Sequence, residues 1–251
     1  MSAFEFRAAH HRTVVAWALA LTLGAACWAL ARHAAGTLPP PRPLEELSYY
    51  PSGEHLKPAT LEFTEAAADL AWLRAVQYYG EHRQTDNRFT RMEHVFDILT
   101  TLAPHFLAPY EFGSFAMAQE GFDFPAAERL MMKGLAANPR SGRLAFQAGF
   151  LYFVRPGGRD YRNAARYFAQ AARQPDAPPQ AARFAAFAGQ QGGDLQLARE
   201  LWTQVAQTSP NRYLREMAER QIRDIAAAEA AGRPDLVVRR QLTPRVLFKK
   251  P

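Results

Sequence analysis

Side chains that could carry out acid–base or metal chemistry are few and scattered in this sequence. The seven histidines form neither a His-x-x-x-His nor a His-Glu-x-x-His pattern, the spacings that place two imidazoles on one helix face. Glu93 and His94 share a predicted helix with Asp97, and this group suits either a metal-ligand pair or an ordinary solvated helix face. The chain also lacks a Cys-x-x-Cys-His haem motif, a phosphate-binding loop and a Gly-x-Ser-x-Gly motif. We therefore expect no catalysis, no cofactor and no metal.

A series of aromatic and cationic residues forms a stronger candidate, and the chemistry that it suits is binding. Residues three to four positions apart on the first helix of each predicted helix pair would face a common groove. The members of the series are Phe112, Arg143, Phe146, Phe150, Phe153, Arg183, Phe187 and Gln190. Aromatic rings edged by arginine suit an extended or helical peptide with an acidic end. The same spacing also serves packing between helix pairs, which is the alternative role for each phenylalanine.

A basic and apolar C-terminal tail is a further candidate. Residues 233–251 combine two short apolar clusters with six basic residues. Five of these are Arg239, Arg240, Arg245, Lys249 and Lys250. The tail carries most of the net charge of +6, so the rest of the chain is close to neutral and no nucleic-acid partner is expected. The tail could bind an acidic partner, touch anionic lipid, lie in the protein's own groove or be a plain mobile terminus.

The elements that must position these residues belong to a helical repeat. In residues 193–210, Gly193 and Asp194 predict a turn, Ala198 and Trp202 follow at helical spacing, and a proline ends the helix. The same pattern occurs upstream, in residues 122–139 and 161–175. The closing prolines lie 35, 36 and 35 residues apart, at Pro104, Pro139, Pro175 and Pro210. A period this regular predicts stacked helix pairs.

Strand signals are scarce, so the expected fold class is all-α, with about four helix pairs in residues 62–210. The first pair is expected to carry a polar insertion, GEHRQTDNR, between its two helices. The later helices are expected at 110–121, 124–137, 142–154, 160–173, 180–191 and 194–208. A helix at 211–231, with apolar residues along one side, would cap the last pair and precede the tail at 232–251.

These repeats resemble the tetratricopeptide repeat family. The likeness rests on a small residue at Ala127, Ala164 and Ala198, a large one at Met131, Phe168 and Trp202, and the closing prolines. The family's first-helix pattern is only echoed, by Trp72 with Tyr79 and by Ala148-Gly149-x-x-Tyr152. The resemblance covers about residues 62–208. It implies a right-handed superhelix of antiparallel helix pairs whose concave groove, lined by the first helices, binds peptide segments or partner proteins.

An uncharged apolar stretch occupies residues 13–31, between basic flanks. As a helix it would span about 28 Å, close to the hydrocarbon thickness of a bilayer. We interpret it as a transmembrane signal-anchor that follows a short tail at residues 1–12. A signal peptide cleaved at Ala29-Leu30-Ala31 is the alternative, and a lipoprotein signal at Cys27 is disfavoured because the apolar run continues beyond it. The short leading tail favours a soluble domain outside the cytoplasm.

Residues 32–61 are interpreted as a Pro-rich linker and cap. Residues 36–43, GTLPPPRP, favour an extended spacer, and residues 44–59 predict an irregular cap over the first helix or, alternatively, a docking segment for a membrane partner. We expect a non-catalytic scaffold or adaptor, anchored in a bacterial inner membrane with a periplasmic domain, that binds a protein or peptide client and assists a membrane or envelope complex. The alternative is a cleaved extracytoplasmic peptide- or solute-binding protein of the same repeat class.

Overall fold

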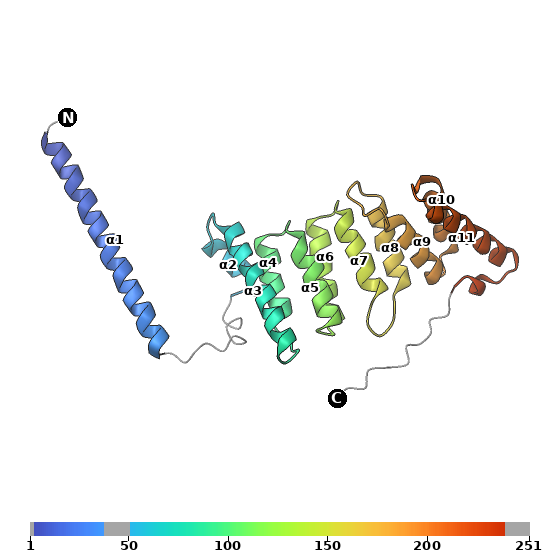
Figure 1. The fold of residues 1–251 in the computed structure, drawn as a ribbon, viewed down its shortest axis with the longest axis horizontal. Helices are drawn as coiled ribbons and strands as arrows, with labels where there is room; N and C mark the ends of the chain where they lie inside the picture. Colours follow the sequence, from blue (N-terminus) through green and yellow to red (C-terminus); the bar gives the residue numbers. More distant parts are fainter. Residues whose placement is uncertain (1–2, 38–50, 239–251) are drawn as a thin grey trace. The chain divides into compact units, whose positions relative to one another are not determined.

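The computed structural model describes residues 3–37 and 51–238, which belong to two separate compact units (Figure 1). All of the regular elements in these described ranges are helices. The first unit consists of α1 (Ala3–Thr37). The basic residues of the tail, at positions 239–250, lie outside the described residues, as does the linker at 38–50.

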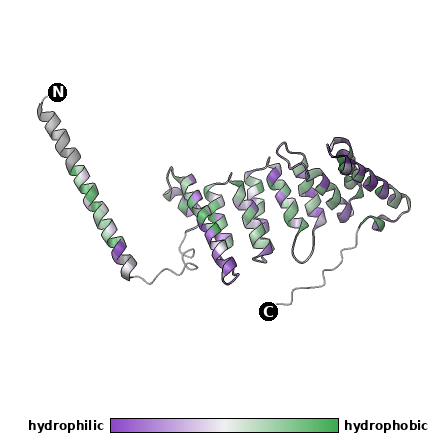
Figure 2. Ribbon diagram, viewed as in Figure 1, coloured by the Kyte–Doolittle hydropathy of each residue, from purple (hydrophilic) through white to green (hydrophobic). Residues whose placement is uncertain are grey.

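Helix α1 contains a segment, Val15–His33, that is long and apolar enough to cross a membrane, and its apolar residues are coloured green in Figure 2. The hydroxyl of Thr22 donates to the carbonyls of Ala18 and Leu19, 3.0 and 2.9 Å away, so its polar group is satisfied within the helix. The helix is longer than the expected stretch at residues 13–31, because Ala-rich flanks extend it at both ends.

The second unit is a series of helices in which each packs on its neighbour along the chain. The helices are α2 (Gly53–Ala59), α3 (Thr64–Gln84), α4 (Met92–Leu102), α5 (Leu107–Gln119), α6 (Phe124–Ala137), α7 (Gly142–Phe153), α8 (Tyr161–Ala172), α9 (Ala181–Gly192), α10 (Leu195–Thr208) and α11 (Arg212–Ala230). A short 3-10 turn, Pro234–Leu236, follows α11. From α5 onward, the helix boundaries lie within three residues of those expected from the sequence.

Two differences from the sequence prediction concern the first helix pair. Helix α3 continues through Gly80 to Gln84, so much of the expected polar insertion is helical. The region expected to be an irregular cap contains α2, which packs on α4. Gly53 makes this contact possible, because a Cβ there would lie 2.6 Å from the Cβ of Thr101.

Recurrent capping residues explain why the later helices begin where they do. Asp123, Asp160 and Asp194 precede α6, α8 and α10, and each carboxylate accepts a hydrogen bond from a backbone amide in the first turn at 3.0 Å. Such a cap satisfies an amide that has no partner within the helix. A proline then follows each helix within a few residues and prevents its continuation. Caps and prolines together set the repeat length.

Small residues bring the helices of each pair close together. Ala127, Ala164 and Ala198 are fully buried in the second helices α6, α8 and α10. Gly134 and Gly149 serve the same purpose, because a Cβ at these positions would lie 2.7 Å from the ring of Tyr110 and 2.6 Å from that of Phe168. The Tyr110 hydroxyl donates to the Pro104 carbonyl at 3.1 Å, and burial raises the pKa of this tyrosine to about 12.

Hydrogen bonds between helix pairs follow the sequence period. The Asn138 amide donates to the Pro104 carbonyl, and the Gln119 amide donates to the Val154 carbonyl. The partners in these bonds are 34 and 35 residues apart. Each pair therefore bonds to the equivalent part of its neighbour, which is the arrangement that the regular proline spacing predicted.

The two ends of the series differ. Helix α11 buries Ala218, Ile225 and Ala228 on one side, as expected of a closing helix. Helix α3 at the other end exposes Leu70, Leu73 and Val76, with exposed fractions of 69%, 58% and 41%. None of the described residues covers this apolar row, since α2 lies on α4.

Candidate functional site

A row of partly exposed aromatic rings crosses the first helices of successive pairs. Phe115 on α5 stacks on Phe150 of α7 with ring centres 5.5 Å apart. Phe150 in turn contacts Phe184 of α9 at 6.4 Å, and Phe153 of α7 contacts Phe187 of α9 at 6.0 Å. All five side chains have intermediate exposure. The rings therefore form one surface that runs across three helices, and we call it the aromatic row.

The aromatic row continues toward the start of the repeats. The Phe112 ring on α5 lies 5.9 Å from Trp72 and 5.0 Å from Tyr79, both on α3, with the rings edge to face. Tyr79 also stacks on Phe89 at 5.6 Å. These rings too are half-buried, so each combines packing against a neighbouring helix with a face that remains available for contact.

The structure separates the residues of the predicted groove into two groups. Phe112, Phe150, Phe153 and Phe187 belong to the aromatic row. Phe146 is buried against Phe168, 5.0 Å away, so it contributes to the core.

Gln190 is likewise a packing residue in the structure. It is 5% exposed, its amide oxygen accepts the Trp202 indole N–H at 3.0 Å, and its amide nitrogen donates to Gln221 and to the Val237 carbonyl. Its position at the end of α9 places it against α10 and α11. The side chain therefore joins three elements and is not presented to a ligand.

The two arginines of the series have different surroundings. Arg143 on α7 forms a two-pronged ion pair with Glu111 on α5, with both N···O distances 2.6 Å. Hydrogen bonding to Glu111 raises the pKa of Arg143, so the pair stays charged. The Arg183 guanidinium lies 5.6 Å from the Phe184 ring. Arg143 thus connects two first helices, whereas Arg183 extends the aromatic row with a cation.

The predicted groove lacked several members of the aromatic row: Phe115 on α5, Phe184 on α9, and Trp72, Tyr79 and Phe89 near the start of the repeats. Phe184 contacts four other rings, those of Phe146, Phe150, Phe153 and Phe168, and the cation of Arg183. The helical spacing chosen for α9 began at Arg183 and so passed over the next residue. The available signal was the three-residue spacing of Phe184 and Phe187, which repeats that of Phe112 and Phe115.

The carboxylates that suggested a metal-ligand pair are occupied by cations in the structure. Glu93 accepts from Arg129 at 2.7 Å, and Asp97 accepts from Lys133 at 2.6 Å. Within the described parts of the chain, no group of three or more His, Cys, Asp or Glu side chains is placed to hold a metal ion.

His82 is the buried histidine closest to an acid–base arrangement. Its Nδ1 lies 2.6 Å from Asp86, and its buried Nε2 has no hydrogen-bond partner. The His82 ring packs against Tyr78 and Phe89, with centres 4.2 and 6.1 Å away. The contacts of His82 are those of a residue that closes the end of α3. A hollow of about 550 Å³ nearby is lined by Phe89 and Arg83, with His82 itself behind them.

Comparison of the chain with protein-family models, with curated proteins and with solved structures found no match.

Proposed function

We propose that this protein is a non-catalytic, membrane-anchored scaffold of the tetratricopeptide-repeat type, which binds a protein or peptide client along its aromatic row. The observation that carries the proposal is that half-exposed rings contact one another from α3 to α5, through Phe112, and from α5 to α7 and α9, through Phe115, three residues further along α5. A core needs rings buried between two helices, whereas this row keeps each ring partly exposed while linking it to the next helix. Partly exposed aromatic rings are the side chains that dominate protein–protein contacts.

The repeat architecture supports the proposal. Capping aspartates, closing prolines and fully buried alanines recur at one period, and hydrogen bonds join residues about one period apart. Both helices of each pair contribute buried residues to the packing, and the first helices also carry the half-exposed rings of the aromatic row. The client is expected to bind as an extended or helical segment that places apolar side chains on the rings.

The membrane part of the proposal rests on α1. Its segment Val15–His33 has the length of a span and its side chains are exposed. We place it as a single anchor in a bacterial inner membrane, with the second unit in the periplasm. The cleaved extracytoplasmic binding protein is the competing assignment. Intact mass of the mature protein separates them, because the anchor retains Met1 and the cleaved form begins near Arg32 or Gly36.

Selection from a random peptide library displayed on phage, followed by titration of the selected peptides, tests the binding function. The double variant Phe150→Ala/Phe187→Ala should weaken a selected peptide at least tenfold, because each exposed ring contributes about 1 kcal/mol or more to such a contact. Tyr213→Ala, which removes an aromatic ring with 65% exposure from α11, is the matched control. Equal binding by the folded double variant would contradict the proposal.

Orientation is tested separately, by protease digestion of right-side-out and inside-out vesicles. If the second unit is periplasmic, protease should cut it in right-side-out vesicles and leave it intact in inside-out vesicles. Digestion from the cytoplasmic side would overturn this part of the proposal and leave the binding function standing.

A further inference from the structure

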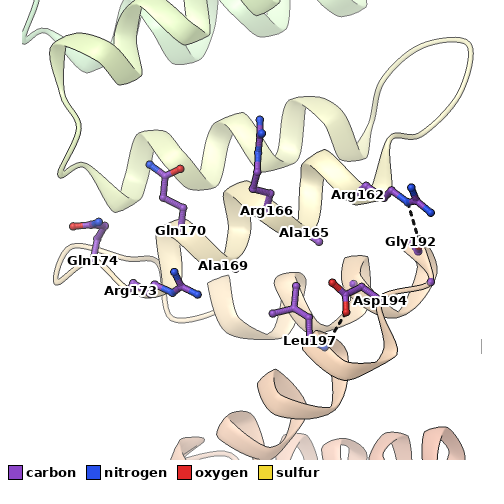
Figure 3. A pocket seen from close by; sticks show the side chains of 12 residues that line it. Arg162, Ala165, Arg166, Ala169, Gln170, Arg173, Gln174, Gly192, Asp194 and Leu197 are labelled. Carbon is purple, nitrogen blue, oxygen red and sulfur yellow. Dashed lines mark hydrogen bonds between the residues drawn. The ribbon is translucent and has the colours of Figure 1, made fainter. Parts of the chain in front are cut away.

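A trough lies beside α8, bordered by the turn that leads from α9 into α10 (Figure 3). Its volume is about 930 Å³, and it shares no residue with the aromatic row. Helices α8 and α10 each pack on α9. The trough is thus a second surface, formed mainly by second helices.

Three arginines line this trough: Arg162 and Arg166 lie on α8, and Arg173 follows directly after its last residue. In Figure 3, Arg162 lies at the end near Gly192, Arg166 projects from the middle of α8, and Arg173 lies at the opposite end. Because α8 rises about 1.5 Å per residue, the Cα atoms of Arg162 and Arg173 are about 16 Å apart. The trough therefore offers positive charge at both ends.

No described carboxylate forms an ion pair with these three arginines. Arg162 makes only a long contact of 3.5 Å with the Gly192 carbonyl, and Arg166 donates to the hydroxyl of Tyr167. Such neutral partners leave the full cationic charge in place.

Asp194 is the only acidic residue among those that line the trough, and its carboxylate already serves as the cap of α10. This carboxylate accepts the Leu197 amide at 3.0 Å. The floor between the arginines is made of small or apolar residues, Ala165, Ala169 and Leu197. A ligand that fits has negative charge at its two ends and small or apolar groups between them.

We propose that this trough binds an acidic, extended segment of a partner protein, with carboxylates on Arg162 and Arg173 and small side chains on Ala165 and Ala169. An extended peptide covers about 3.3 Å per residue, so acidic residues about five positions apart match the two arginines. The depression between these arginines suits a chain that lies within it, whereas a membrane surface is broad and flat. The chain's own tail is excluded as the occupant, because its residues at 239–250 are basic.

Fluorescence anisotropy with a labelled peptide tests this site on the full-length protein in detergent. The probe peptide carries two pairs of glutamates separated by about four alanines, the spacing that the helix geometry gives. We expect Arg162→Gln/Arg173→Gln to weaken binding about tenfold at low salt. The control, Arg140→Gln/Arg220→Gln, makes the same change in net charge at exposed positions outside the trough and should bind as the wild type does.

A second peptide of the same composition, with its glutamates contiguous, should bind more weakly than the spaced peptide. Circular dichroism and thermal unfolding establish that the variants fold, as their exposed positions predict. Equal loss in the trough and control variants would reduce the effect to net charge and overturn the proposal. It would also be overturned if vesicles containing phosphatidylglycerol, or inorganic phosphate, bound in an Arg162- and Arg173-dependent manner while the peptide did not.

Discussion

Two hollows beside second helices, one between α4 and α6 and one beside α8, differ in whether the charged side chains that line them are paired. Between α4 and α6, Glu93 bonds Arg129 and Asp97 bonds Lys133, so charges are paired across the junction. Beside α8, Arg162 and Arg173 line a trough in which neither forms a described ion pair, since its one acidic lining residue, Asp194, caps α10. The hollow at the α4–α6 junction has about 410 Å³ against about 930 Å³ beside α8. Paired charges are thus found where the helices close together, and unpaired ones where space remains.

The largest effect is expected from adding a methyl group where helices pack closely, and it contrasts with the same change beside the trough. Gly134→Ala on α6 places a Cβ 2.7 Å from the buried Tyr110 ring, and we expect it to lower the free energy of unfolding by about 2 kcal/mol. Gly189→Ala, beside the trough, meets its nearest atoms at 3.5 Å and should gain up to about 1 kcal/mol from better helix propensity. Urea denaturation measures both. A destabilised Gly189→Ala variant would show that the trough has less room than described.

Gln190 joins α9 to α10, the helix from which Leu197 lines the trough. Gln190→Leu removes the acceptor of the Trp202 indole and leaves a buried N–H unpaired, so we expect a loss of about 1.5 kcal/mol in the free energy of unfolding. Gln196→Leu, at an exposed position on α10, is the control and should change stability little. A Gln190 variant as stable as the wild type would contradict the structural role assigned to this bond.

Asp176 lies three residues after Arg173 and caps the start of α7. This carboxylate accepts the Gly142 amide at 2.7 Å, and that hydrogen bond is the main cause that lowers the pKa of Asp176 below its usual value. The native state therefore gains stability above the unfolded pKa and loses it as the pH falls through about 4 and below. Asp176→Asn should cost about 0.5–1 kcal/mol at pH 7, less than a buried cap because the side chain is exposed.

Thermal unfolding over a pH series checks this prediction. The difference between wild type and Asp176→Asn should be constant from pH 5 to pH 8 and shrink below pH 4. A difference that persists unchanged at pH 3 would show that the ionised carboxylate is not responsible.

The smallest effect is expected from the paired junction itself. A double-mutant cycle with Asp97→Ala and Lys133→Ala should give a coupling of about 0.5 kcal/mol, because both groups are accessible to solvent. The coupling should decrease in 1 M salt. A coupling that salt leaves unchanged would contradict the assignment of this contact to a solvent-exposed ion pair.

The regular helix boundaries could be predicted because each depends on a local signal. Asp194 and Pro210 delimit α10 without reference to any other helix, and the same holds for α6 and α8. Helix α3 was predicted less well, since Gly80 suggested a stop. That glycine has open space around it, so nothing forces the chain to turn there and the residues that follow continue the helix.

The ion pairs between helices could not be predicted from any single helix, because they depend on which helix lies opposite. The pairs Glu93–Arg129 and Asp97–Lys133 join residues 36 positions apart, which is one period. A search for opposite charges one period apart would have found them. Applied to Arg162, the same search finds Leu197, 35 positions further on. It therefore identifies Arg162 as an arginine with no carboxylate one period further on.

The bonds that join successive helix pairs also determine how the second unit can acquire its structure. Contacts such as Asn138 with Pro104 and Gln119 with Val154 close loops of only about one period, so the loop-closure entropy at each step is small. Each pair can dock as soon as its own residues and those of the preceding pair are available. A chain that emerges slowly from a ribosome or a translocation channel can therefore fold in order, from α3 toward α11, without waiting for its C-terminus.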